Sequence, residues 1–200
     1  MHLDDALDKL EAIHAQVLRS ETYRGFRALP TALTGAIALC AAVLQSRFAP
    51  AADAIAFAHW WMGVAVLAGM VGASDLVLHW VRGGPDARWR SLQVLRQIGA
   101  PFGIGALFTF ALLQVGGEAV TLLPGVWAAC FGGAIVSARP FLPERISAAA
   151  GFYLVAAVAL LVRDLRTPVP EPLGMGITFG VGQLLAAFAL RRGREVDDGT

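Results

Sequence analysis

Asp75 and His79 come nearest, by residue type and spacing, to a chemical site in this chain. They lie four residues apart in an apolar segment, which places both side chains on one face of a helix. A carboxylate inside a membrane-spanning helix costs roughly a few kcal/mol unless it is paired, protonated or hydrated. The functional interpretation is an ion- or proton-binding carboxylate in a polar cavity, with His79 as its partner. The structural alternative is an aspartate near the membrane interface that reaches headgroup water or pairs with Arg82.

The adjacent Ser74 does not turn this pair into a hydrolase triad. Successive residues on a helix point about 100° apart, so Asp75 can orient His79 while Ser74 faces elsewhere. His59 and His79 lie on the same predicted helix about 30 Å apart in rise, which excludes a shared haem iron. The chain has no metal-ligand spacing and no Gly-x-x-x-x-Gly-Lys phosphate loop. We therefore expect no enzyme activity, catalytic residue, cofactor or metal.

Two glutamines are the remaining polar candidates inside apolar segments. Gln114 and Gln183 lie near the far ends of the third and sixth segments. A glutamine in a membrane helix more often hydrogen-bonds a neighbouring helix than a ligand. Under a transport hypothesis, these glutamines join Asp75 and His79 as candidate ion, proton or polar-cavity residues.

Six apolar segments would position these side chains. The sequence is 56% hydrophobic and 16% charged, whereas soluble domains carry about 25% charged residues. A hydrocarbon core about 30 Å thick requires about 17–25 apolar helical residues, which predicts an all-α membrane protein with six transmembrane helices over residues 28–190. The predicted spans are Ala28–Gln45, Ile55–Trp80, Ile98–Val115, Ala119–Ala138, Ile146–Val162 and Leu173–Leu190.

The distribution of Lys and Arg predicts the orientation of these spans. With the amino terminus in the cytoplasm, 13 of the 16 basic residues fall on the cytoplasmic side. The other three are Arg47, Arg163 and Arg166, the last two accompanied by Asp164 and Glu171. Because cytoplasmic loops carry the excess of Lys and Arg, we expect an inner or plasma membrane protein with both termini in the cytoplasm. Residues 191–200 then form a cytoplasmic tail.

Residues 1–24 are predicted to form a short cytoplasmic amphipathic helix. Its apolar residues recur at three- and four-residue steps, and three aspartates lie in its first turns, where the helix dipole favours negative charge. This helix packs on its own bundle or on a second copy in one hypothesis, and docks a cytoplasmic protein in the other. The apolar face comprises Leu3, Leu7, Leu10, Ile13 and Val17.

A second amphipathic segment precedes the third span. Trp89, Leu92 and Leu95 recur at helical spacing with arginines between them, after a Gly-Gly-Pro breaker. This pattern predicts a short basic helix in the inner headgroup layer that leads into the third span. Anchoring is the simpler interpretation of this helix, and lipid sensing is the more ambitious one.

Two proline-glycine patterns suggest an internal repeat. The third span opens with Pro101-Phe-Gly-Ile-Gly-Ala-Leu-Phe, and the sixth opens with Pro172-Leu-Gly-Met-Gly-Ile-Thr-Phe. The first and fourth spans also share a Leu-Pro opening. One hypothesis is two inverted three-helix halves, residues 28–116 and 119–190. The alternative is ordinary helix starts, because proline suits a first turn and glycine permits close helix packing.

Two functional classes remain after these exclusions. The scarcity of polar residues inside the spans favours a non-enzymatic membrane scaffold or regulatory component that binds a partner. The repeat hypothesis and Asp75 favour the alternative, a small transporter or channel subunit with Asp75 at or near an ion or proton pathway. We expect the lipid bilayer as a partner in both cases. We expect no nucleic acid, because the chain has no basic stripe interleaved with aromatic residues.

Overall fold

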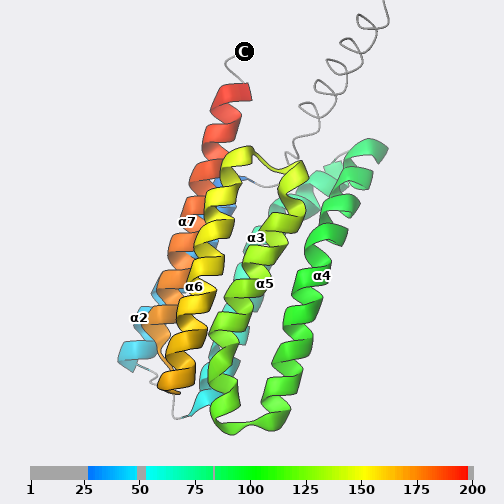
Figure 1. Cartoon of the computed structure of the whole chain (residues 1–200). Helices are drawn as coiled ribbons and strands as arrows, with labels where there is room; N and C mark the ends of the chain where they lie inside the picture. The colour runs from blue at the N-terminus through cyan, green and yellow to red at the C-terminus, as the bar shows by residue number, and fades with distance from the viewer. Residues whose placement is uncertain (1–26, 49–52, 83, 198–200) are drawn as a thin grey trace, which may run out of the picture.

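The computed structural model describes residues 27–48, 53–82 and 84–197, and the side chains at 75, 79, 85–87, 90 and 193–197 are outside that description. The described chain is helical, and six helices are long and apolar enough to cross a membrane (Figure 1). The predicted amphipathic helix over residues 1–24 lies outside the described residues. The elements are α2 (Ala28–Phe48), α3 (Ala54–Arg82), α4 (Pro85–Val115), η1 (Gly117–Leu122), α5 (Leu123–Ala138), η2 (Arg139–Phe141), η3 (Glu144–Ile146), α6 (Ser147–Arg166) and α7 (Pro172–Asp197).

Prolines lie in the first turn of four long helices, where a missing backbone N–H costs nothing because it would have no helical partner. Pro101 is different: the prediction that it opens a helix is wrong, because it lies inside α4. The expected basic amphipathic helix and the third span are therefore one continuous helix. The four first-turn prolines are Pro30, Pro85, Pro124 and Pro172.

A pair of glycines makes the tight connection between α4 and α5. Gly116 ends α4 with φ 71°, and Gly117 begins η1 with φ 56°. Residues with a Cβ rarely adopt these positive φ values, so the two glycines let the chain reverse within a short loop. The backbone N–H of Gly116 also donates to the carbonyl of Leu112 at 2.9 Å, which closes the last turn of α4.

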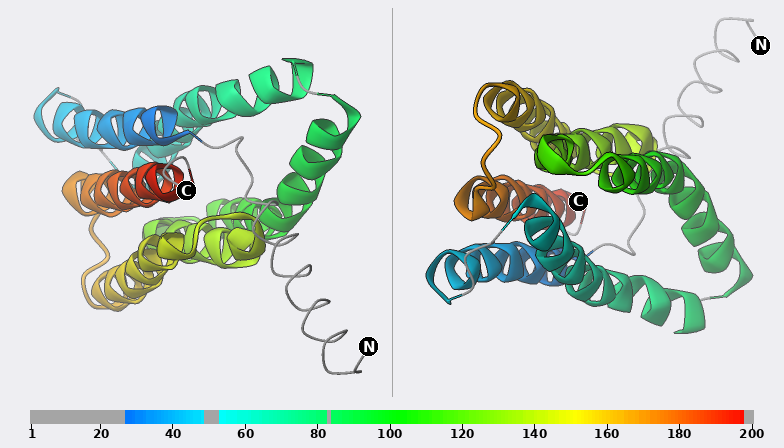
Figure 2. Two further views of the ribbon diagram at one scale, coloured as in Figure 1. Left: turned by 90° about the horizontal axis from the view of Figure 1, so that it is seen from above. Right: turned by 90° about the horizontal axis from the view of Figure 1, so that it is seen from below.

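The six long helices form a ring in chain order. Each helix packs on its neighbours in sequence, and α7 closes the ring by packing on α2. The α2–α7 contact is the most extensive of these, and the α3–α4 contact is the least extensive. Figure 2 shows α7 between α2 and α6, while the corner where α3 and α4 are joined stands away from the other helices.

Glycines on α7 allow α2 to approach closely. A Cβ built on Gly176 would lie 2.3 Å from the Cβ of Ala42, and one on Gly180 would lie 2.5 Å from the Cγ of Leu39. On α2, a Cβ on Gly35 would lie 2.9 Å from the carbonyl oxygen of Gly180. Small residues that bring backbones together are the usual basis of helix association in membranes, where water supplies no hydrophobic force. The close approach of the α2 and α7 backbones therefore closes the ring of helices.

Aromatic rings fill the space between α4, α5, α6 and α7. The ring of Phe131 on α5 has neighbours on each of the other three helices. Its centroid lies 5.4 Å from Phe102, 4.9 Å from Tyr153 and 5.7 Å from Phe179. Tyr153 reaches α7 because Gly182 has no side chain, and a Cβ there would lie 2.3 Å from the tyrosine ring. The interior on this side of the ring is filled.

Two helices contribute little to this interior. In the most apolar 18-residue window of α3 and of α4, 6% of residues are buried, against 33–50% in the other four helices. On α4 the buried and half-buried positions recur at three- and four-residue steps from Ser91 to Leu112, and α4 packs on α5. A similar stripe on α3 runs from Phe57 to Leu76, and α3 packs on α2. The α3–α4 hairpin is thus held from its two sides, with little contact between its own arms.

Candidate binding surface

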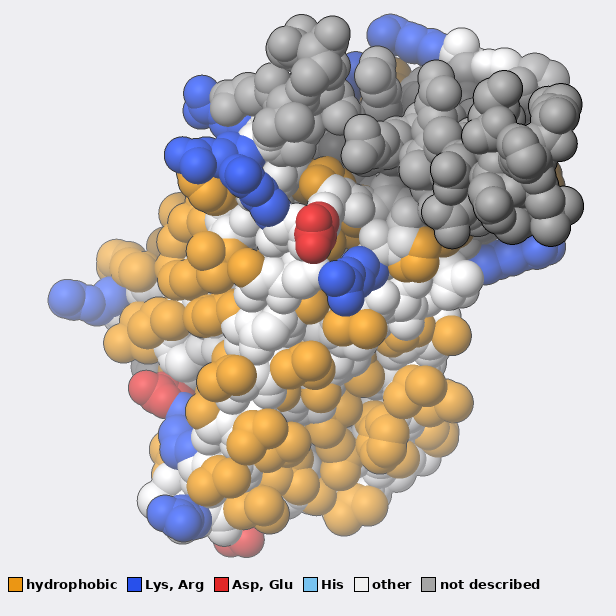
Figure 3. Space-filling model, turned by 45° about the horizontal axis from the view of Figure 1, so that its top comes forward, with side chains coloured by type: hydrophobic (Ala, Val, Ile, Leu, Met, Phe, Trp, Pro, Cys, Tyr) orange, Lys and Arg blue, Asp and Glu red, His pale blue; other side chains and the backbone are white. Residues whose placement is uncertain are grey.

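Most described arginines gather at one end of the bundle, which we call the arginine-rich end. At this end α3 ends and α4 begins. The same end holds the start of α2, the α5–α6 connection and the last turns of α7. Figure 3 shows most of the visible Lys and Arg side chains toward this end, above a broad hydrophobic surface. The described arginines that define this end are Arg27, Arg82, Arg88, Arg96, Arg139, Arg145, Arg191 and Arg192.

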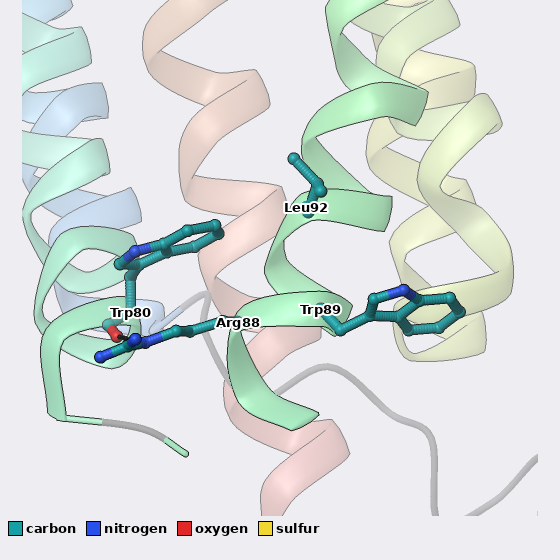
Figure 4. Close-up of a pocket in the computed structure, with 4 residues that line it drawn as sticks. All are labelled: Trp80, Arg88, Trp89 and Leu92. Atoms are coloured by element: carbon teal, nitrogen blue, oxygen red, sulfur yellow. Dashed lines mark hydrogen bonds between the residues drawn. The ribbon is translucent and has the colours of Figure 1, made fainter. Parts of the chain in front are cut away.

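The α3–α4 hairpin forms a pocket at the arginine-rich end. It has a volume of about 340 Å³ and is lined by Trp80, Arg88, Trp89 and Leu92. Figure 4 shows the Trp80 ring directed from α3 toward α4, with Leu92 above it and the Trp89 ring on the other side of α4. The wall of the pocket is therefore apolar except for one guanidinium group.

A single hydrogen bond links the two arms of the hairpin at this pocket. The Nε of Arg88 donates to the carbonyl oxygen of Trp80 at 3.1 Å (Figure 4). Trp80 lies in the last turn of α3, where carbonyl groups have no partner within the helix. The bond satisfies one of these carbonyls and fixes the guanidinium at the mouth of the pocket.

The charge around the pocket is positive. Arg82, Arg88 and Arg96 are exposed on the hairpin. Among the carboxylates whose side chains the structure describes, Glu144 lies in the α5–α6 connection, and Asp53, Glu118, Asp164 and Glu171 lie at the opposite end. Asp75 and Asp86 lie on the hairpin itself, with side chains outside the description. This surface combines large apolar side chains with excess positive charge, which suits an amphipathic, negatively charged partner.

The predicted pair Asp75 and His79 lies on α3, within the arginine-rich half of the hairpin. The helix is continuous through both positions, so their four-residue spacing does place them on one helical face. Their side chains are outside the description, and the expected contact between them stays a prediction.

The predicted glutamines are not brought together. Gln114 is exposed one residue before the end of α4, away from the arginine-rich end. Gln183 is half-buried in α7 and faces α2, because a Cβ on Gly35 would lie 3.0 Å from its Cβ. Gln183 therefore lies at the α2–α7 contact and Gln114 on an exposed face of α4, so the two share no interface.

Sequence reasoning missed a polar residue that is buried at the α2–α3 contact. Gln45 of α2 is 1% exposed, and its Oε1 accepts a hydrogen bond of 2.9 Å from Trp61 Nε1 on α3. Ala38, Ala41, Ala42 and Gln45 follow one another at helical steps on the buried side of α2, but the span is apolar all round, so the sequence alone does not mark this side.

Asp164 was noted only as a companion of the outer arginines, but it is a buried charged residue. It is 2% exposed, and its Oδ1 accepts a hydrogen bond of 2.8 Å from Arg163 Nε. The guanidinium of Arg163 also forms an ion pair with Glu171, the residue before α7. Asp164 Oδ2 is buried without a hydrogen-bond partner. Arg163 therefore shares its charge between two carboxylates and joins α6 to α7.

The described residues hold no group of three or more His, Cys, Asp or Glu side chains that could bind a metal ion. The apolar face predicted on Leu3, Leu7, Leu10, Ile13 and Val17 lies outside the described residues. Comparison of the chain with protein-family models, curated proteins and solved structures finds no match.

Proposed function

We propose that this chain is a non-enzymatic integral membrane protein, a scaffold or regulatory component that binds a partner at its arginine-rich end. In this proposal the six long helices cross an inner or plasma membrane, and the arginine-rich end and both termini lie in the cytoplasm. The excess of arginine at one end supports this orientation. The ion pairs of Arg163 with Asp164 and Glu171 support it too, because they neutralise one of the three basic residues on the other side.

The close packing of the bundle interior is the observation that carries this proposal. Glycines at the α2–α7 and α5–α6 contacts leave less room than one added methyl group needs. Some polar side chains in the interior are paired with each other, as in Gln45 with Trp61 and Thr109 with Trp127, while Trp60 Nε1, Ser147 Oγ and Asp164 Oδ2 are buried without a hydrogen-bond partner. A hydrated pathway needs polar groups that are free to contact water or an ion. The interior therefore favours a static component over a transporter.

The predicted amphipathic helix would supply the docking face. The described chain begins at Arg27, at the same end of the bundle as the α3–α4 pocket. An amphipathic helix binds a groove or a second helix through its apolar stripe. A cytoplasmic protein and a second copy of this chain are both suitable partners, and the experiment below separates them.

Photo-cross-linking in living cells tests this function. A photoreactive amino acid at Leu10, on the apolar stripe, should give one discrete adduct whose mass identifies a second copy or another protein. The same amino acid at Lys9, one position off the stripe, is the matched control and should give none. The double change Leu7→Ser and Ile13→Ser should abolish the Leu10 adduct. Adducts of equal yield from both positions, or from neither, would contradict the proposal.

A transporter or channel subunit is the second candidate, and the α3–α4 hairpin supports it. Asp75 lies on α3, and the α3–α4 contact is the least extensive one between neighbouring helices of the ring. The order of the helices is also compatible with two inverted three-helix halves. In the ring, α5, α6 and α7 follow one another as α2, α3 and α4 do, and each set packs on the other at both ends. A simple up-and-down ring of six helices without an internal repeat has the same neighbours, so the order of the helices favours neither a repeat nor its absence. Ion or proton flux into liposomes that hold the unchanged protein, and loss of that flux in a folded Asp75→Asn variant, would establish this candidate.

A further inference from the structure

The arginine-rich half of the α3–α4 hairpin is exposed around most of each helix. Trp80, Val81 and Arg82 are exposed in succession on α3, as are Leu95, Arg96 and Gln97 on α4. Successive helical residues point about 100° apart, so three in a row cover most of the circumference. The other described residues therefore leave surface between the two arms uncovered. If the helices cross a bilayer, hydrocarbon or another polypeptide must fill that space, because water there would meet an apolar wall.

The pocket offers two kinds of contact at this place. Trp80 and Leu92 present apolar surface that continues along exposed residues of both helices, such as Val77 and Leu95. Arg88 stands at the mouth with its Nε bound to the Trp80 carbonyl, which leaves the two terminal nitrogens as donors. An apolar wall with one fixed guanidinium matches a molecule with a hydrocarbon part and an anionic head.

The net charge of the hairpin selects among such molecules. Counted on the sequence, residues 82–96 carry four arginines and one aspartate, a net charge of about +3 at pH 7. Guanidinium groups bind phosphate through paired hydrogen bonds, and basic pockets between membrane helices on the cytoplasmic side recognise anionic lipid headgroups. Tryptophans at the membrane interface have an apolar body suited to acyl chains and a polar edge suited to headgroups.

We infer that the α3–α4 pocket binds one anionic phospholipid. Arg88 contacts its phosphate, and an acyl chain lies against Trp80 and Leu92 between the two helices. Arg82 and Arg96 add the positive field that favours an anionic head over a zwitterionic one. This inference needs the membrane orientation proposed above but not the protein partner, so either can fail alone.

The chain's own amino-terminal segment is the competing occupant. Residues 1–18 have an apolar stripe and carry four carboxylates against one lysine, so they too suit a basic apolar pocket. The lipid is favoured because the pocket continues along helices that are themselves apolar enough to cross the membrane. The experiment below includes an outcome for the competing segment.

Native mass spectrometry of the full chain in detergent tests the site. Titration with dioleoylphosphatidylglycerol should show one lipid bound at least tenfold more tightly than dioleoylphosphatidylcholine. Arg88→Gln should weaken the phosphatidylglycerol complex at least fivefold, and Arg88→Lys should restore only part of the loss, because lysine keeps the charge without the paired donors. Arg145→Gln, an equal change of charge at the same end, is the matched control and should alter the affinity less than twofold.

Three results would overturn the inference. Equal affinity for the two lipids would mean that the pocket does not select an anionic head. Equal weakening by Arg88→Gln and Arg145→Gln would mean that binding follows net charge alone. Efficient disulfide formation between cysteines placed at Leu10 and Leu92 in a bilayer would mean that the amino-terminal segment fills the pocket. Both arginines are exposed, so a folding defect is not expected in either variant.

Discussion

At the scale of single residues, specific partners compensate two of the buried polar or charged side chains, Asp164 and Gln45. Arg163 holds the buried Asp164 on one side and the exposed Glu171 on the other. Gln45 and Trp61 satisfy each other across the α2–α3 contact. A buried polar group that loses its partner keeps its desolvation cost, so removing one member of such a pair does more harm than removing both.

Arg163→Gln should therefore destabilise the protein by about 3 kcal/mol at pH 7, because it leaves the Asp164 carboxylate buried without its cation. Arg166→Gln removes an equal charge from an exposed position one turn later and should cost less than about 0.5 kcal/mol. Detergent-induced unfolding followed by tryptophan fluorescence measures both. The double change Arg163→Gln and Asp164→Asn should recover more than half of the loss. Equal effects of the two single arginine variants would show that the buried pair does not stabilise the fold.

The polar residues could be predicted from the sequence only where a charge broke an apolar run. Asp75 stood out for this reason, while Gln45 was passed over because it lies at the end of a span, where a glutamine can reach water. Asp164 was passed over because the Arg163–Arg166 segment was assigned to a loop, whereas α6 continues to Arg166. Placing either residue inside required knowing which face of its helix is buried, and the spans are apolar all round.

At the scale of helices, steric fit rather than polarity selects the partners. The six spans were predicted from length and composition, and the structure confirms six helices of sufficient length. The predicted Gly-Gly-Pro breaker separates α3 from α4, whereas the short basic helix and the third span, predicted as two segments, form one helix that contains Pro101. The α2–α7 contact was not predicted, since it depends on where glycines meet small residues of a helix distant in sequence.

Gly176→Ala should destabilise the α2–α7 contact by about 1–3 kcal/mol, because the added Cβ would overlap the Cβ of Ala42 at 2.3 Å and neither backbone can yield cheaply. Gly151→Ala in α6 is the matched control, since a Cβ there meets nothing within 4 Å. That control should be neutral or stabilise by up to about 1 kcal/mol, as alanine is the better helix former. The same unfolding assay distinguishes the two variants. A Gly176→Ala protein as stable as the Gly151→Ala protein would contradict close packing at this interface.

At the scale of the whole molecule, a closely packed half and an open hairpin lie in one ring. The helices α2, α5, α6 and α7 provide the packed interior, and α3 and α4 extend from it with little contact between them. A scaffold uses the packed half for stability and the arginine-rich end for binding. A transporter would instead use the hairpin as a moving part beside Asp75. The two accounts differ in whether water enters between the helices.

Cysteine accessibility in lipid measures that difference most directly. Single cysteines along residues 71–79 of α3, and along α4 and α7, are introduced into a background with Cys40→Ala and Cys130→Ala. Membrane-impermeant thiol reagents are then applied from each side. Our account predicts labelling at the helix ends and protection at every deeper position, because packed side chains and lipid exclude water. A reactive stripe at helical period that extends past Asp75 into the bundle would contradict it and establish a hydrated pathway.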